Sequence, residues 1–202
     1  MKKSLLILFG PLVFAGSLSA QTYLSEDFEG GTMPAGWTPN PASPAANAWS
    51  VPGVTSTYFT PPAHTVYADI NDDANQSASN PNQALNTPVV NLSSATSVFL
   101  KYDAFFPGIS PETASIKYST DGGATFSTVG PVTGDGSGWQ TYYVNLTTQC
   151  AGQANVVIQF QYNDGGAWSY GFAIDNVVIY TPPPVSAEFT SITPSQGSPS
   201  AY

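Results

Sequence analysis

The sequence is poor in positive charge. Its 202 residues include no arginine and four lysines, against 13 aspartates and glutamates, and the formal net charge is −9. So few cations are unable to neutralise a phosphate backbone, which argues against nucleic acid as a partner. Charged residues make up 8% of the chain, so its surface must consist mainly of Ser, Thr, Asn, Gly and Tyr. Such a surface is typical of extracellular proteins and of proteins that contact sugars.

Residues that serve metal and nucleophilic catalysis are equally scarce. The chain has one cysteine, Cys150, and one histidine, His64. A single cysteine excludes an internal disulfide, and we expect Cys150 to be a small buried side chain. Two such residues are too few for a catalytic zinc site, and no Gly-x-Ser-x-Gly segment presents a serine nucleophile. Glycoside hydrolysis needs only two carboxylates, but no pattern places a pair across a cleft, so we expect a protein without catalytic activity.

Long apolar runs are also rare, and the longest lies at the start of the chain. Residues 5–14 are mostly apolar, two lysines precede them, and small residues follow at positions 16–20. This order predicts a secretory signal peptide over residues 1–20 rather than a buried helix, because the run is too short to span a bilayer. Removing it changes the formal net charge from −9 to −11. We expect the mature chain to be secreted, extracellular or at the cell surface, without a transmembrane segment.

No part of the mature chain shows an apolar stripe at helical spacing, whereas apolar and polar residues often alternate. The alternation is clearest in four segments, at residues 98–106, 114–119, 142–146 and 158–162. Alternation of this kind marks half-buried strands. Turns rich in Gly and Asp separate the strands, at residues 121–123, 134–138 and 163–166. The pattern predicts an all-β fold, an antiparallel jelly-roll β-sandwich with its aromatic residues between two sheets.

The composition also suggests where the domain ends. Residues 21–181 carry the strand pattern and form one domain, within which the proline-rich residues 39–62 are expected to loop over one end of the sandwich. Three consecutive prolines then begin residues 182–202, a segment rich in Pro, Ser and Thr. A run of prolines is unable to continue a β-ladder and is typical of a stiff linker. We interpret this segment as a linker or tail, which favours a larger multi-module secreted protein.

Three motifs resemble those of a known family of secreted modules. They are Phe-Glu-Gly-Gly at residues 28–31, Met-Pro-Ala-Gly-Trp at residues 33–37 and Ile-Asp-Asn-Val at residues 174–177, with Trp49 and residues 84–93 between them. From about residue 23 to residue 180 the chain is similar to cleaved-adhesin modules of the gingipain and hemagglutinin type, also described as choice-of-anchor modules. The resemblance implies a MAM-like jelly roll. The Asp-x-Asp-Gly-Asp run that often follows the tryptophan in this family is absent.

The resemblance also implies a structural calcium ion, Ca²⁺, which takes six to eight oxygen ligands in irregular loops. The first and last strands of a jelly roll can lie side by side, so Asp27 and Glu29 are expected near Asp175. Because Asp27 and Glu29 are two residues apart, they would share one face of an extended strand. The alternative is a solvated acidic edge. A weaker metal candidate is the oxygen-rich loop at residues 69–75, with Asp69, Asn71, Asp72 and Asp73.

Aromatic residues make up 13% of the chain and include four tryptophans. Trp37 follows Pro34, Ala35 and Gly36 and is expected to plug the core. Trp168 lies in a turn-rich segment and is the strongest candidate for exposure, and Tyr170 beside it completes a surface on which a sugar would stack. Other aromatic residues considered for stacking are Trp49, Trp139, Tyr58, Tyr67 and Tyr162.

Two classes of function fit these observations. One is an adhesin-like binding module that recognises glycans or cell-surface proteins. The other is a structural or accessory spacer in a larger secreted protein such as a peptidase. Aromatic rings gathered on one surface favour the binding module, whereas rings that all turn inward favour the spacer.

Overall fold

A computed structural model describes residues 20–39, 48–75 and 82–183, and of Asn75 it describes the backbone alone. Strands dominate the regular structure of these residues. In chain order the elements are β1 (Gln21–Glu26), β2 (Thr38–Pro39), β3 (Ala68–Asn71), the 3-10 turn η2 (Asp73–Asn75), β4 (Gln83–Asn86), β5 (Phe99–Phe105), β6 (Thr113–Ser119), β7 (Ser127–Val132), β8 (Gln140–Asn145), the single helical turn α1 (Thr147–Cys150), β9 (Val157–Asn163) and β10 (Gly171–Thr181).

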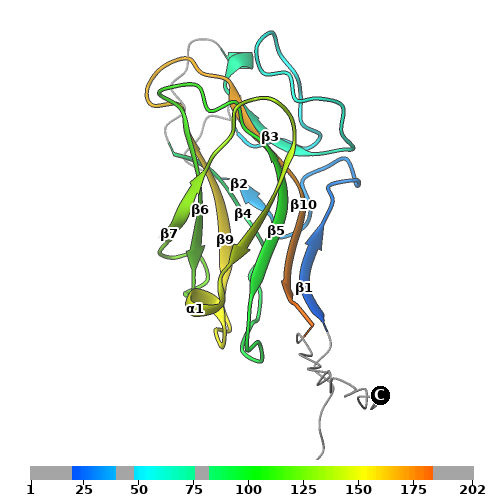
Figure 1. Ribbon diagram of the computed structural model, residues 1–202, viewed down its shortest axis with the longest axis vertical. Helices are drawn as coiled ribbons and strands as arrows, with labels where there is room; N and C mark the ends of the chain where they lie inside the picture. The colour runs from blue at the N-terminus through cyan, green and yellow to red at the C-terminus, as the bar shows by residue number, and fades with distance from the viewer. Residues whose placement is uncertain (1–19, 40–47, 76–81, 184–202) are drawn as a thin grey trace, which may run out of the picture.

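The strands form two five-stranded antiparallel sheets that lie face to face (Figure 1). In the first sheet β10 pairs with β5 along one side, and β8 lies beyond β5. The other side of β10 pairs with β3 near its beginning and with β1 near its end. The second sheet has the order β2-β4-β9-β6-β7. The predicted antiparallel sandwich is confirmed, and its first and last strands are neighbours.

The core lies between the sheets and follows the alternation in the sequence. In β5, Leu100, Tyr102 and Ala104 are buried, whereas Lys101 and Asp103 remain partly exposed. Burial of large apolar side chains supplies most of the free energy that favours folding, since the chain has no disulfide to restrict its unfolded state.

Two single-residue predictions about the core are confirmed. Trp37 is buried, with ring centroids 5.2 Å from Phe28 and 6.5 Å from Phe160, so it plugs one side of the sandwich. Cys150 is a buried free thiol, and burial raises its pKa to about 11. A thiol with a raised pKa is a poor nucleophile, which agrees with a packing role.

The structure corrects the expectation of a loop at residues 69–75. Ala68–Asn71 is strand β3, which pairs with β10, and η2 follows it directly. The four residues of β3 do alternate, with Ala68 and Ile70 in the core and Asp69 and Asn71 bonded to the loops, but the run is short and its polar residues are typical of turns. The segment at residues 48–62, by contrast, lies in loops at one end of the sandwich, as expected (Figure 1).

Some predictions fall on residues that the structure does not describe. The predicted signal peptide, apart from Ala20, lies outside the described residues, as do residues 40–47, 76–81 and the predicted tail from residue 184. Across the described residues, no helix is long and apolar enough to cross a membrane.

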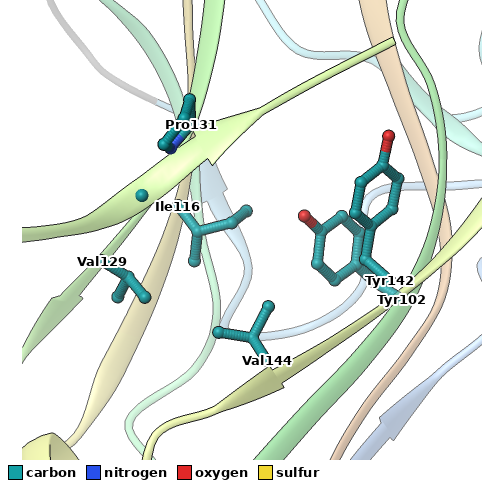
Figure 2. Close-up of a pocket in the computed structure, with 7 residues that line it drawn as sticks. Tyr102, Ile116, Val129, Pro131, Tyr142 and Val144 are labelled. Atoms are coloured by element: carbon teal, nitrogen blue, oxygen red, sulfur yellow. The ribbon is translucent and has the colours of Figure 1, made fainter.

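Residues of the outer strands β7 and β8, together with residues of β5 and β6, line a pocket between the two sheets (Figure 2). A slot of about 230 Å³ lies there, with apolar walls from Ile116, Val129 and Val144 and from the rings of Tyr102 and Tyr142. The two tyrosine rings stack with centroids 5.0 Å apart. The Tyr142 hydroxyl donates to the carbonyl of Thr133 and links the two sheets. The slot is therefore an extension of the core toward the open side of the sandwich.

Candidate functional site

The loops before β3 and before β10 lie at one end of the sandwich, far from the start of β1 and the end of β10 (Figure 1). Three aromatic rings from these loops form a platform around one pocket. Tyr58 and Tyr170 are nearly parallel, with centroids 5.9 Å apart, and Trp168 meets Tyr58 edge-on at 5.6 Å. The three side chains line a pocket of about 150 Å³. Tyr58 is 52% exposed and Trp168 is 51% exposed, so the platform faces solvent. Sequence analysis placed Trp168 beside Tyr170, but only the fold brings Tyr58 to them.

The carboxylate of Asp73 is bonded to the backbone behind this platform. Its Oδ2 atom accepts hydrogen bonds from the Ser56 hydroxyl at 2.5 Å, from the Tyr58 amide at 2.7 Å and from the Phe59 amide at 3.4 Å. The Asp73 amide donates to the Tyr170 carbonyl at 3.1 Å. Its second carboxylate oxygen, Oδ1, is buried and has no hydrogen-bond partner among the described residues.

Asp73 is charged at neutral pH in this setting. Burial raises its pKa, but the Ser56 hydroxyl, two backbone amides and the nearby Trp168 indole together lower the pKa below its ordinary value. Asp73 therefore holds the backbone of two platform residues and lies beside the third. The consequence is a negative charge directly behind the aromatic pocket.

Two further buried acids fix the segment that carries Trp168 and Tyr170. Asp72 accepts a hydrogen bond from the Ser169 amide at 2.6 Å. Glu112 accepts from the amides of Tyr170 at 3.1 Å and Gly171 at 3.3 Å. Burial raises the pKa of Glu112, although these hydrogen bonds oppose the increase. The platform is thus held by acids from η2, from the β3–η2 junction and from the turn just before β6.

Asp69 and Asn71, the other members of the weaker metal candidate, serve the same loops. Asp69 accepts from the Ser50 hydroxyl and from the Val54 amide, each at 2.8 Å, and burial raises its pKa to about 7. The Asn71 amide group donates to the Val54 carbonyl at 2.8 Å. Asn71 and Asp73 share the Ser56 hydroxyl as a partner, whereas Asp69 bonds Ser50 and Val54 and Asp72 bonds the Ser169 amide, so the four side chains serve as loop contacts.

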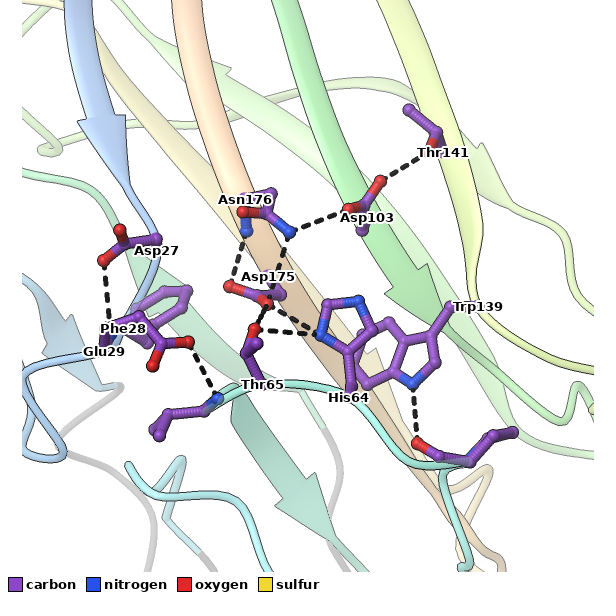
Figure 3. A network of polar contacts seen from close by, with 12 residues as sticks. Asp27, Phe28, Glu29, His64, Thr65, Asp103, Trp139, Thr141, Asp175 and Asn176 are labelled. Atoms are coloured by element: carbon purple, nitrogen blue, oxygen red, sulfur yellow. Dashed lines mark hydrogen bonds and ion pairs between the residues drawn. The ribbon is translucent and has the colours of Figure 1, made fainter.

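Asp175 lies at an irregularity in β10, in a network of polar contacts (Figure 3). Its Oδ2 is 2.9 Å from the His64 Nδ1 and accepts from the Thr65 hydroxyl at 3.2 Å. The Asn176 amide donates to Oδ1 at 2.7 Å. Asn176 has a positive φ of 51°, and its side chain donates to Asp103 at 2.9 Å. Burial, more than any other factor, raises the pKa of Asp175.

The network borders an open depression of about 580 Å³, lined by Ala63, His64, Thr65 and Asn176. The His64 ring packs on Trp139 with centroids 4.2 Å apart, and the Trp139 indole donates to the Pro62 carbonyl at 3.0 Å (Figure 3). These contacts fix the imidazole over the buried carboxylate. Besides the Asn176 amide, Asp175 therefore has a histidine as a partner, which sequence analysis did not connect with it.

The predicted arrangement of Asp27 and Glu29 on one extended strand is wrong. Strand β1 ends at Glu26, and Phe28 has a positive φ of 54°, because the chain turns there to place its ring in the core. The Glu29 amide donates to Asp27 at 3.2 Å, and the Glu29 carboxylate accepts from the Val66 amide at 3.0 Å. The described residues contain no group of three His, Cys, Asp or Glu side chains placed to hold a metal ion.

Solved structures share this fold. The K3 cleaved adhesin domain of Lys-gingipain from Porphyromonas gingivalis is 19% identical, with a TM-score of 0.59, and the match covers 80% of this chain and 99% of that domain. A CBM22 xylan-binding domain from Paenibacillus barcinonensis is 11% identical, with a TM-score of 0.50, covering 81% and 96%. A cyclase from Fischerella sp. TAU is 16% identical, with a TM-score of 0.51, covering 82% and 99%. No family model and no curated protein matches the sequence.

These similarities confirm the resemblance to cleaved-adhesin modules at the level of fold. The same sandwich also occurs in a carbohydrate-binding domain and in an enzyme. One fold therefore supports several functions, and the function of this chain has to be argued from its own side chains.

Proposed function

We propose that the protein is a secreted, non-catalytic binding module that recognises glycans through the platform formed by Tyr58, Trp168 and Tyr170. The observation that carries the proposal is the gathering of three large rings around one solvent-facing pocket. Exposed aromatic rings present flat apolar faces on which the C–H groups of a sugar stack, while the tyrosine hydroxyls remain available for hydrogen bonds. A spacer without a ligand gains nothing from such a surface.

The rigidity of the platform supports this proposal. The buried acids Asp72, Asp73 and Glu112 fix the backbone of the platform residues before any ligand arrives. A preformed site loses little conformational entropy on binding, so more of the contact energy contributes to affinity. The fold shared with a xylan-binding domain and with adhesin domains also favours a binding role over a catalytic one. A cell-surface protein as target, or a spacer role in a larger secreted protein, are the alternatives.

The test is a glycan array followed by titration calorimetry with the tightest oligosaccharide. We expect Trp168→Ala to weaken binding at least tenfold, because the loss of one stacked ring should reduce the free energy of binding by about 1.4 kcal/mol or more. Tyr143→Ala is the matched control, since Tyr143 is 66% exposed on β8 and lies outside the platform. Equal affinities of the two variants, or no bound glycan on the array, would favour the spacer.

Stabilisation by calcium is a separate proposal that rests on the resemblance alone. If calcium uses Asp175, the midpoint of thermal unfolding should be higher with calcium than with a chelator, because a ligand of the folded state raises its stability. Asp175→Asn should remove that difference, whereas Asp121→Asn, in an exposed turn, should leave it unchanged. Equal midpoints of the wild-type protein in calcium and in chelator would contradict the proposal.

A further inference from the structure

We propose that the platform selects sugars that carry a protonated amine, such as unacetylated hexosamines, over neutral and anionic sugars. This inference rests on the proposed glycan-binding function and names the ligand class of the same site. It follows from the combination of three aromatic faces with a buried carboxylate directly behind them.

The aromatic rings attract a cation through their faces. Tryptophan and tyrosine rings carry negative charge on their faces, and an ammonium group within about 6 Å of a ring centroid is held electrostatically. The pocket between Tyr58, Trp168 and Tyr170 has a volume of about 150 Å³. It is large enough for an ammonium group with its adjoining carbons, and too small to enclose an oligosaccharide. A sugar ring would therefore stack across the opening and direct its amine inward.

Asp73 adds a full negative charge to this attraction. Its carboxylate bonds the Tyr58 amide, its own amide bonds the Tyr170 carbonyl, and it lies beside the Trp168 indole. The carboxylate is buried and stays ionised, because the Ser56 hydroxyl, two backbone amides and the Trp168 indole lower its pKa, so its negative charge lies beside the platform rings. Charge in a poorly hydrated site acts more strongly than in water, which favours a cationic ligand.

Within residues 20–39, 48–75 and 82–183, no lysine or arginine lies at this end of the sandwich. The chain has no arginine, and the lysines within the described residues are Lys101 and Lys117. Lys101 lies opposite Val178 in the middle of its sheet, and Lys117 lies opposite Gln159, so both are in the body of the sandwich. A carboxylated sugar would meet Asp73 without a compensating cation, and we expect such ligands to be rejected.

The experiment compares three tetrasaccharides by titration calorimetry with the full secreted chain at about pH 6. They are a β-1,4-glucosamine tetramer, the same tetramer N-acetylated, and xylotetraose. We expect the glucosamine tetramer to bind at least tenfold more tightly than the other two, because acetylation removes the charge and leaves the ring unchanged. Trp168→Ala should abolish this binding. Asp73→Asn should reduce the preference, and near-UV circular dichroism checks that the variant keeps its fold.

Each outcome separates this inference from the proposed function. Equal binding of all three tetramers, lost in Trp168→Ala, would overturn the preference for amines while supporting a glycan-binding platform. A preference for glucosamine that persists in Trp168→Ala would show general attraction to an acidic protein and overturn the inference. Absence of binding by any tetramer would overturn it as well. Because acetylation changes only the ligand, the main comparison does not depend on a variant that folds.

Discussion

Single buried carboxylates hold the loops of this protein. At Asp69, their contribution to stability can be measured through its dependence on pH. The folded state raises the pKa of Asp69 to about 7, against an ordinary value of 3.8, so it keeps its proton to higher pH than the unfolded chain does. Wild-type stability should therefore fall as pH rises from about 4 to about 7, by a few kcal/mol at most. Urea unfolding across this range should show a smaller fall in Asp69→Asn than in the wild type, since Glu112 and Asp175, whose pKa values burial also raises, still contribute. Parallel profiles would contradict the assignment.

For some single residues, the burial of the side chain was predictable from the sequence. Trp37 follows a Pro-x-Gly corner and is buried, whereas Trp168 lies among turn residues and is half exposed. Both outcomes follow from local sequence. The orientation of Asp27 and Glu29 was not predictable in this way, because one positive φ at Phe28 changes the direction of the chain. Alternation along a strand gives no sign of such a residue.

Among the strands, β7 contains a glycine, Gly130, where an added side chain would meet no other atom. An added Cβ at Gly130 meets nothing within 4 Å, and no positive φ is present there. Gly130→Ala should stabilise the protein by about 0.5–1 kcal/mol, because alanine restricts the unfolded chain without strain in the folded one. Gly134→Ala is the control, since its Cβ would lie 2.0 Å from the Phe106 carbonyl oxygen. The urea midpoint should rise in Gly130→Ala and fall in Gly134→Ala. A lower midpoint in both variants would contradict the argument.

Strands that expose one face to solvent were predictable from the sequence, whereas the other strands were not. Alternation located β5, β6, β8 and β9 to within two or three residues, because one face of each contacts the core. Strand β3 has four residues, of which Asp69 and Asn71 are typical of turns, and β2 has only two residues, so neither run is long enough to indicate a strand. In β7, Gly130 and Pro131 resemble a turn, although the segment pairs with β6 at the edge of its sheet, where proline is tolerated.

For the whole molecule, the fold rather than the sequence creates the candidate site. Tyr58 belongs to a proline-rich loop, Asp73 to η2, Glu112 to the turn before β6 and Trp168 to the loop before β10. These positions are separated by up to 110 residues and meet because the jelly roll brings its loops to one end (Figure 1). The local sequence identifies two of the three platform rings, Trp168 and Tyr170. The third ring and the carboxylate behind it require the three-dimensional structure.

The net charge of the whole molecule leads to a last prediction. With 13 acids and four lysines, the folded chain is repelled by its own charge, and salt screens that repulsion. Raising sodium chloride from about 0.1 M to about 1 M shortens the Debye length from about 10 Å to about 3 Å. We expect the added salt to raise the midpoint of thermal unfolding at neutral pH. The rise should be about 2–4 °C for each kcal/mol by which the salt increases the free energy of unfolding. At about pH 3.5, where most carboxylates take up protons, the same salt should have a much smaller effect. A rise of equal size at both pH values would mean that salt acts through apolar burial instead of charge.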